Sequence, residues 1–303
     1  MEPGTLDQLF REAVALIDAG DLTGLEHFLA AKPTVAQERL VEPGPWLSDT
    51  FGGKLPDFFK RPYLLWFVAE DPIRVGRLPQ NIAQIAHAII ESVRRENHSS
   101  LQEQLDYALR LVSWSTVARK GGVQIELIDV LADAGGSLAG HPDNALVNGN
   151  IAAAEHLVQR GSPLTLGTAL CLERWPDVQR LAANATSSER QFALVLAALN
   201  GKAEALRRMV RLGADVNTPS QNLYSHGTPL HHAVCSGRLE AVQVLVEAGA
   251  NLHAQDTAWH GTPLGWALHY VEEKKSNDER EQYEKIAAYL RQKLTDAPPS
   301  AQS

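Results

Sequence analysis

The chain has 303 residues and a mass of 33.1 kDa, with 44% hydrophobic residues, 21% charged residues and a formal net charge of −8. This composition excludes global disorder, collagen and a coiled coil, and the acidic balance argues against nucleic acid and anionic membranes as partners. The length fits about two globular domains or one elongated repeat array.

The predicted elements of the N-terminal half are short helices. Apolar residues at helical spacing predict a helix over residues 6–17, and a segment that begins with a glycine predicts another near 21–31. The same spacing predicts helices near 82–97 and 122–134. No clear alternation of apolar and polar residues predicts a strand, so we expect an all-α fold.

Residues 32–62 form the longest irregular stretch and are rich in proline and glycine. Loops of this length are uncommon in compact domains and are often functional. Trp46 and Phe51 are therefore secondary candidates for contact with a partner. Alternatively, the two side chains anchor the loop to the helices.

Three segments of the C-terminal half align without gaps, at residues 149–161, 201–213 and 237–249. Each has glycines at both ends and apolar residues at the same offsets between them. The first glycine suits the turn into a helix, and the second suits the left-handed residue that ends it. With further candidates near 175–184 and 283–294, the chain holds about eight such second helices of a helix-pair repeat.

A Gly-Thr-Pro-Leu motif begins at Gly227 and again at Gly261. The threonine hydroxyl can cap a helix N-terminus, and proline at the first helical position has no N–H to leave unsatisfied. Each motif therefore predicts the first helix of a pair.

Together these residues resemble the ankyrin repeat, whose pattern is carried almost completely by residues 227–256. The specific resemblance covers about residues 145–271, and it implies an all-α ankyrin-repeat helical solenoid of about eight helix pairs. The N-terminal half lacks the Thr-Pro-Leu motif, so we interpret it as degenerate ankyrin-like pairs; a separate helical domain is the alternative. Residues 61–70 also resemble a segment of bacterial ankyrin-repeat proteins, which implies no activity.

The predicted organisation has four parts. Residues 1–140 form degenerate helix pairs with the irregular loop at 32–62, and residues 141–271 form the ankyrin repeats. A charged helix at 272–294 caps the solenoid, since terminal repeats need a polar outer face. Residues 295–303 form a disordered tail. The apolar stripe of the capping helix consists of Tyr283, Ile286, Ala287 and Leu290.

Two cysteines without a CxxC pair exclude a disulfide framework and a zinc ribbon and indicate a reducing compartment. No secretory apolar region follows the acidic N-terminus, and the longest strongly apolar run, residues 63–69, is too short to span a membrane. We therefore expect a cytoplasmic protein that does not bind a membrane; an effector exported without a readable signal is an alternative.

Known catalytic motifs are missing from the sequence: it has no GxSxG, P-loop, GxGxxG or HExxH pattern. Six of the eleven histidines lie between residues 226 and 269, but His226 and His260 occupy equivalent positions of successive repeats, about 10 Å apart. A metal needs about three converging ligands, so we expect no metal site and no cofactor. The resemblance implies that His231 braces neighbouring repeats, and Cys235 is interpreted as a small buried thiol.

Binding of another protein or peptide is the function that the resemblance implies, on the concave face and the fingers between repeats. The candidate partner-binding residues are Tyr224, His226, His232, Trp259, His260 and Trp266. By register with the family pattern, His232 and Trp266 face the concave side. Tyr224 and Trp259 are typical hot-spot residue types, but they could equally pack one finger against the next, together with Leu223.

We therefore predict a non-enzymatic, monomeric interaction scaffold without catalytic residues. The alternative is a small-ligand or metal-binding protein or an enzyme. Its site would use the N-terminal loop or the histidine-rich fingers.

Overall fold

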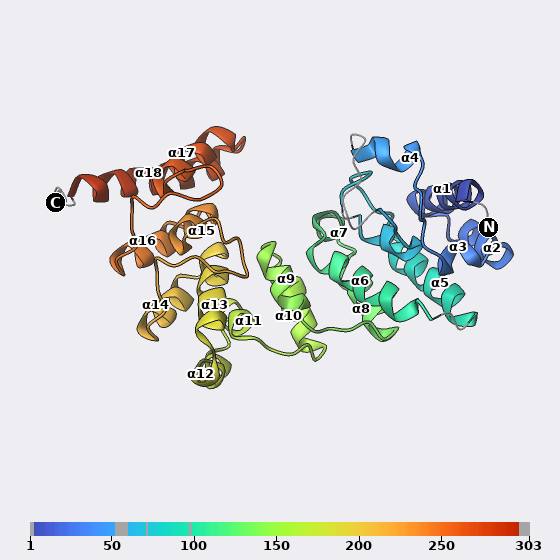
Figure 1. Cartoon of the computed structure of the whole chain (residues 1–303), viewed down its shortest axis with the longest axis horizontal. Coiled ribbons are helices and arrows are strands. Elements are labelled where there is room, and N and C mark those ends of the chain that lie inside the picture. Colours follow the sequence, from blue (N-terminus) through green and yellow to red (C-terminus); the bar gives the residue numbers. More distant parts are fainter. Residues whose placement is uncertain (1–2, 52–59, 71, 97–98, 297–303) are drawn as a thin grey trace. The chain divides into compact units, whose positions relative to one another are not determined.

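The computed structural model describes residues 3–51, 60–70, 72–96 and 99–296 (Figure 1). Within these ranges the ordered elements are all helices, and no strand is present, which confirms the all-α prediction. No helix in these ranges has the length and the apolar character needed to cross a bilayer. The chain divides into two compact units, one of residues 1–145 and 152–163 and the other of residues 146–151 and 164–303.

The first unit contains three helix pairs. They are α1 (Pro3–Ala19) with α2 (Leu22–Ala31), η3 (Leu64–Ala69) with α5 (Ile82–Arg95), and α6 (Leu101–Trp114) with α8 (Gln124–Asp133). The first members, α1, η3 and α6, contact one another in order, and so do the second members, α2, α5 and α8. This two-row stacking is the arrangement expected of helix-pair repeats. The described residues of the unit also form the short helices α3 (Thr34–Gln37), α4 (Pro45–Ser48), η1 (Asp49–Phe51) and α7 (Thr116–Lys120).

The second unit contains four helix pairs. They are α11 (Leu166–Cys171) with α12 (Trp175–Asn184), α13 (Ser187–Leu199) with α14 (Ala203–Arg211), α15 (Pro229–Cys235) with α16 (Leu239–Glu247), and α17 (Pro263–Glu273) with α18 (Asn277–Asp296). The helices α11, α13, α15 and α17 contact each other in turn and form the first-helix row; α14, α16 and α18 do the same in the second-helix row. The remaining pair is α9 (His141–Val147) with α10 (Ile151–Gln159), and the residues of this pair are divided between the two units. Each predicted second helix corresponds to a helix, which confirms about eight pairs.

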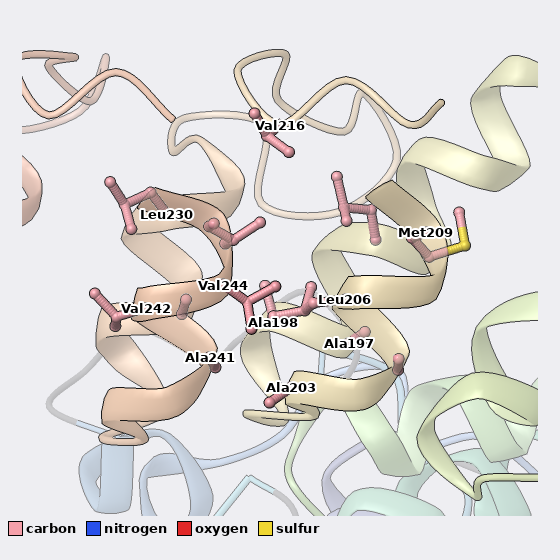
Figure 2. Close-up of a cluster of buried hydrophobic side chains, with 14 of the residues drawn as sticks. Ala197, Ala198, Ala203, Leu206, Met209, Val216, Leu230, Ala241, Val242 and Val244 are labelled. Atoms are coloured by element: carbon pink, nitrogen blue, oxygen red, sulfur yellow. The ribbon is translucent and has the colours of Figure 1, made fainter. Parts of the chain in front are cut away.

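A continuous apolar core fills the space between the two rows of the second unit. Figure 2 shows its centre, where Leu206 and Met209 of α14 lie near Ala197 and Ala198 of α13. The small alanines let the helices approach closely, and the larger side chains fill the remaining volume. Burying each large side chain stabilises the unit by about 1.5–3 kcal/mol.

Glycine at the turn between paired helices is required by the backbone. Gly237 has a φ of 68°, a left-handed conformation that is costly for residues with a Cβ atom, and a Cβ there would lie 3.3 Å from the Tyr283 ring. Gly249, which ends α16, has a φ of 90° and open space around it. The predicted roles of the paired glycines are confirmed at these positions. Glu173 adopts the same left-handed conformation, with a φ of 58°, at the turn between α11 and α12.

The C-terminal end differs from the prediction in its boundaries. Residues 272 and 273 end α17, and α18 runs from Asn277 to Asp296, so it pairs with α17 as a second helix. The four predicted stripe residues of this helix are all buried. Thr295 belongs to the last turn of α18, where its hydroxyl donates to the carbonyl of Arg291, and residues 297–303 of the predicted tail lie outside the described residues.

Candidate functional site

A pocket of about 710 Å³ lies in the second unit and is lined by first helices and by two fingers. The first finger is the loop of residues 212–228 before α15, and the second is the loop of residues 248–262 before α17. Five of the six predicted partner-binding residues line it: Tyr224, His226, His232, Trp259 and Trp266. Cys235, His269 and Tyr270 are further lining residues. We call this site the aromatic pocket. His260 is exposed and lies outside the lining.

The imidazole of His226 lies at the centre of the ring cluster. Its centroid is 5.2 Å from that of Trp259, 5.9 Å from that of Trp266, 6.0 Å from that of His232 and 6.1 Å from that of Tyr224. These separations fall in the range of favourable aromatic contacts. The structure thus brings residues of two successive fingers and two first helices together.

Two large side chains at this pocket remain open to solvent. Trp259 is 70% exposed and Tyr224 is 46% exposed, whereas their neighbour Leu223 is buried. Packing between fingers was the alternative for Leu223, Tyr224 and Trp259, and of these three only Leu223 is buried. Tyr224 and His260 have φ values of 43° and 56°, and a left-handed conformation costs such residues about 1–2 kcal/mol. Backbone strain of this kind is concentrated at functional sites.

Asp256 fixes the shape of the second finger. Its Oδ1 accepts hydrogen bonds from the backbone N–H groups of Ala258 at 2.8 Å and Trp259 at 2.7 Å. Its Oδ2 accepts from the N–H of Gly261 at 2.8 Å and from the indole Nε1 of Trp266 at 2.9 Å. Burial opposes ionisation of this carboxyl group, but the N–H donors prevail and lower its pKa to about 2. Asp256 is the last residue of the segment that resembles the ankyrin repeat, and an aspartate that directly precedes a turn is a signal for such capping.

His231 braces neighbouring repeats, as the resemblance implied. Its Nδ1 accepts from the N–H of Thr228 at 3.2 Å and from the Thr228 hydroxyl at 2.8 Å, and its Nε2 donates to the carbonyl of Gly261 at 3.0 Å. Thr228 and Thr262 are the N-cap residues of α15 and α17, and the hydroxyl of Thr262 accepts from the N–H of Gly265 at 3.1 Å, as predicted for the Thr-Pro-Leu motif. Both ring nitrogens of His231 are occupied, so neither is available to activate the thiol of Cys235.

His232 is only 3% exposed, and it holds the first finger from below. Its Nε2 donates to the carbonyl of Tyr224 at 3.2 Å. Burial lowers the pKa of His232 to about 4, so the imidazole is neutral at pH 7. His232 thus lines the pocket and holds the carbonyl of Tyr224, and its contact with a partner stays a prediction.

Cys235 is half-buried at one side of the pocket. The hydroxyl of Tyr270 donates to its Sγ at 3.2 Å, and the hydroxyl of Tyr283 donates to its carbonyl at 2.9 Å. Burial raises the pKa of Tyr283 to about 12 and also raises that of Tyr270, so both phenols stay protonated and donate. The contacts of Cys235 are those of a packed thiol. Among the described residues, no group of three or more His, Cys, Asp or Glu side chains is placed to hold a metal ion.

Trp46, the secondary candidate in the N-terminal loop, lies in the first unit. Its Nε1 donates to Oδ1 of Asp7 at 2.7 Å, and its ring stacks on Phe67 at 6.3 Å between centroids. These contacts favour the alternative in which Trp46 anchors the loop. Phe51, in η1, is half-buried.

Comparison with known proteins identifies the repeats. Residues 144–256 match the family model for ankyrin repeats, in three copies. No curated protein matches the chain. Among 214 matching chains of solved structures is the crystal structure of the human ASB11 ankyrin repeat domain, with 19% sequence identity and a TM-score of 0.35; the match covers 74% of this chain and all of that one.

Proposed function

Because residues 144–256 are ankyrin repeats, modules that generally bind other proteins, we propose that the second unit is a non-enzymatic interaction module. It binds a segment of another protein in the aromatic pocket and along the two fingers beside it. The observation that carries this proposal is the exposed indole of Trp259 at the mouth of a pocket lined by further aromatic rings. Tryptophan and tyrosine are the residue types most often responsible for binding energy.

The fingers are held in place before any partner arrives. Asp256 accepts four hydrogen bonds within its own finger and from Trp266, and His232 fixes the carbonyl of Tyr224. A preorganised surface loses little conformational entropy on binding, so more of the contact energy appears as affinity. The same hydrogen bonds occupy the carboxylate of Asp256 and Nε2 of His232, which supports a positioning role for these two side chains.

The alternative function, a small-ligand or metal-binding protein or an enzyme, has no specific observation in its favour. His231 and His232 of α15 act as structural donors to the fingers, and Trp46 of the N-terminal loop contacts Asp7. We therefore argue only the protein-binding role.

Selection from a random peptide display library with the full chain tests this proposal. We expect the enriched peptides to lose about 30-fold in affinity with Trp259→Ala, since truncating a hot-spot tryptophan costs about 2 kcal/mol. The exposed position of Trp259 keeps the fold intact in this variant. Leu212→Ala is the matched control, because Leu212 is an exposed apolar residue at the end of α14 and does not line the pocket. Peptides that bind wild type and Trp259→Ala equally would contradict the proposal.

A further inference from the structure

We propose that the aromatic pocket takes a positively charged side chain of the partner, the head group of a lysine, a methylated lysine or an arginine. This inference rests on the proposed function and specifies the chemistry of the residue that the pocket binds. Three features of the described residues support it: the aromatic lining, the lack of a lysine or arginine in that lining, and a buried carboxylate hydrogen-bonded to the edge of one indole.

The lining of the pocket includes two indoles and a phenol. Trp259 and Trp266 lie 6.0 Å apart between centroids at an interplanar angle of 65°, and the Tyr224 ring lies 6.1 Å from the His226 ring, which both indoles contact. Indole and phenol faces carry negative potential, and a cation within about 6 Å of such a face gains about 0.5–2 kcal/mol. An aliphatic side chain in the same place gains only the burial of its surface.

No fixed positive charge lines the pocket. Between Arg211 and Lys274 the sequence contains a single lysine or arginine, Arg238, against six acidic residues. Arg238 is the N-cap of α16 in the second-helix row and lies outside the lining. His232 is kept neutral by its burial. A cation that enters the pocket therefore meets no lysine or arginine in its walls.

A negative charge lies at the Nε1 edge of the Trp266 ring. The indole Nε1–H donates to Oδ2 of Asp256 at 2.9 Å, and this carboxylate is buried. The low pKa of Asp256 keeps it ionised throughout the physiological range. A hydrogen bond from the indole N–H to an anion increases the negative potential on the faces of the ring. The surrounding protein screens the carboxylate charge less than water does. The same charge disfavours an acidic side chain in the pocket.

Two small probes of nearly the same shape test the inference: choline and its neutral carbon analogue 3,3-dimethylbutan-1-ol. Titration of the full chain, followed by tryptophan fluorescence and by the indole N–H resonances, gives a dissociation constant for each. We expect choline to bind about fivefold or more tightly than the neutral alcohol, equivalent to about 1 kcal/mol. We expect Trp259→Phe to keep this preference and Trp259→Leu to abolish it, because leucine retains apolar surface without a π face.

The outcomes separate this inference from the proposed function. Equal or tighter binding of the neutral alcohol would overturn the inference, while peptides whose affinity depends on Trp259 would still support a protein-binding role for an apolar anchor. No binding of either probe at 100 mM, well above the millimolar affinity expected of so small a cation, would also overturn it. If the library yields no peptide that depends on Trp259 although choline binds selectively, the proposed function fails and the cation specificity stands.

Discussion

Replacement of Asp256 by asparagine tests the hydrogen-bond network that shapes the second finger. The carboxylate accepts four N–H groups, and each hydrogen bond to a charged acceptor contributes about 1.5–3 kcal/mol. An asparagine can accept the two bonds from Ala258 and Trp259, but its amide N–H groups then face the donors of Gly261 and Trp266. Loss of two bonds, partly offset by relaxation of the exposed finger, predicts a decrease of about 3 kcal/mol in the free energy of unfolding.

Urea unfolding at pH 7, followed by tryptophan fluorescence, measures this decrease. Thr257→Ala is the matched control, since this exposed threonine lies in the same finger. We expect the control to change stability by less than about 0.5 kcal/mol. Equal stability of Asp256→Asn and wild type at pH 7 would refute the role assigned to the carboxylate.

The pH dependence gives an independent check on the same group. The folded pKa of Asp256, about 2, lies below its ordinary value of 3.8. The stabilisation from the ionised group is therefore complete above about pH 5 and is lost as the pH falls from about 4 through 2. We expect wild type to lose at most about 2 kcal/mol relative to Asp256→Asn over this window, after allowance for solvent screening. An unchanged difference between the two proteins from pH 7 to pH 2 would contradict a depressed pKa.

Three further variants test the packing. Gly237→Ala should lower the free energy of unfolding by about 2 kcal/mol, which is more than we expect for Gly249→Ala. Both glycines have left-handed backbones, but only at Gly237 would a Cβ approach a tyrosine ring. Urea titration compares the two variants, and equal effects would exclude that contact. Leu206→Ala should lower the free energy of unfolding by about 2–5 kcal/mol, because Leu206 is fully buried and its truncation leaves a cavity in the core. A smaller loss measured by calorimetry would show that the core collapses into the cavity. Trp46→Phe should lower the free energy of unfolding by about 1 kcal/mol, because the hydrogen bond to Asp7 is lost, and should leave peptide capture unchanged. Reduced capture without a change in stability would make Trp46 a partner contact.

The positions of most second helices could be predicted from the sequence because glycine spacing and helical periodicity are local signals. The η3 helix could not. Its six residues, Leu64–Ala69, are all buried and form a continuous apolar run, so no periodicity marks it as the first member of a pair. The boundaries of α18 were also displaced from the prediction, because dense charge around Glu272 obscured the turn between the last two helices.

The residue types of the pocket were predictable, but their orientations were not. The finger motif indicated Tyr224 and Trp259, yet the backbone at Tyr224 decides that this ring is exposed while Leu223 is buried. The register placed His232 on the concave side but did not indicate its burial or its hydrogen bond to the Tyr224 carbonyl. Such outcomes depend on the backbone conformation of the finger and on its hydrogen bond to the helix that follows, which no local pattern encodes.

The central claim is that a partner segment binds in the aromatic pocket, and the indole N–H resonances of the six tryptophans test it most directly. Spectra of the full chain are recorded during titration with a peptide selected from the display library, with each resonance assigned by a Trp→Phe variant. The proposed site predicts shifts for Trp259 and Trp266, with the remaining tryptophans unchanged. Shifts confined to tryptophans outside the pocket, with Trp259 and Trp266 unmoved at saturation, would contradict it.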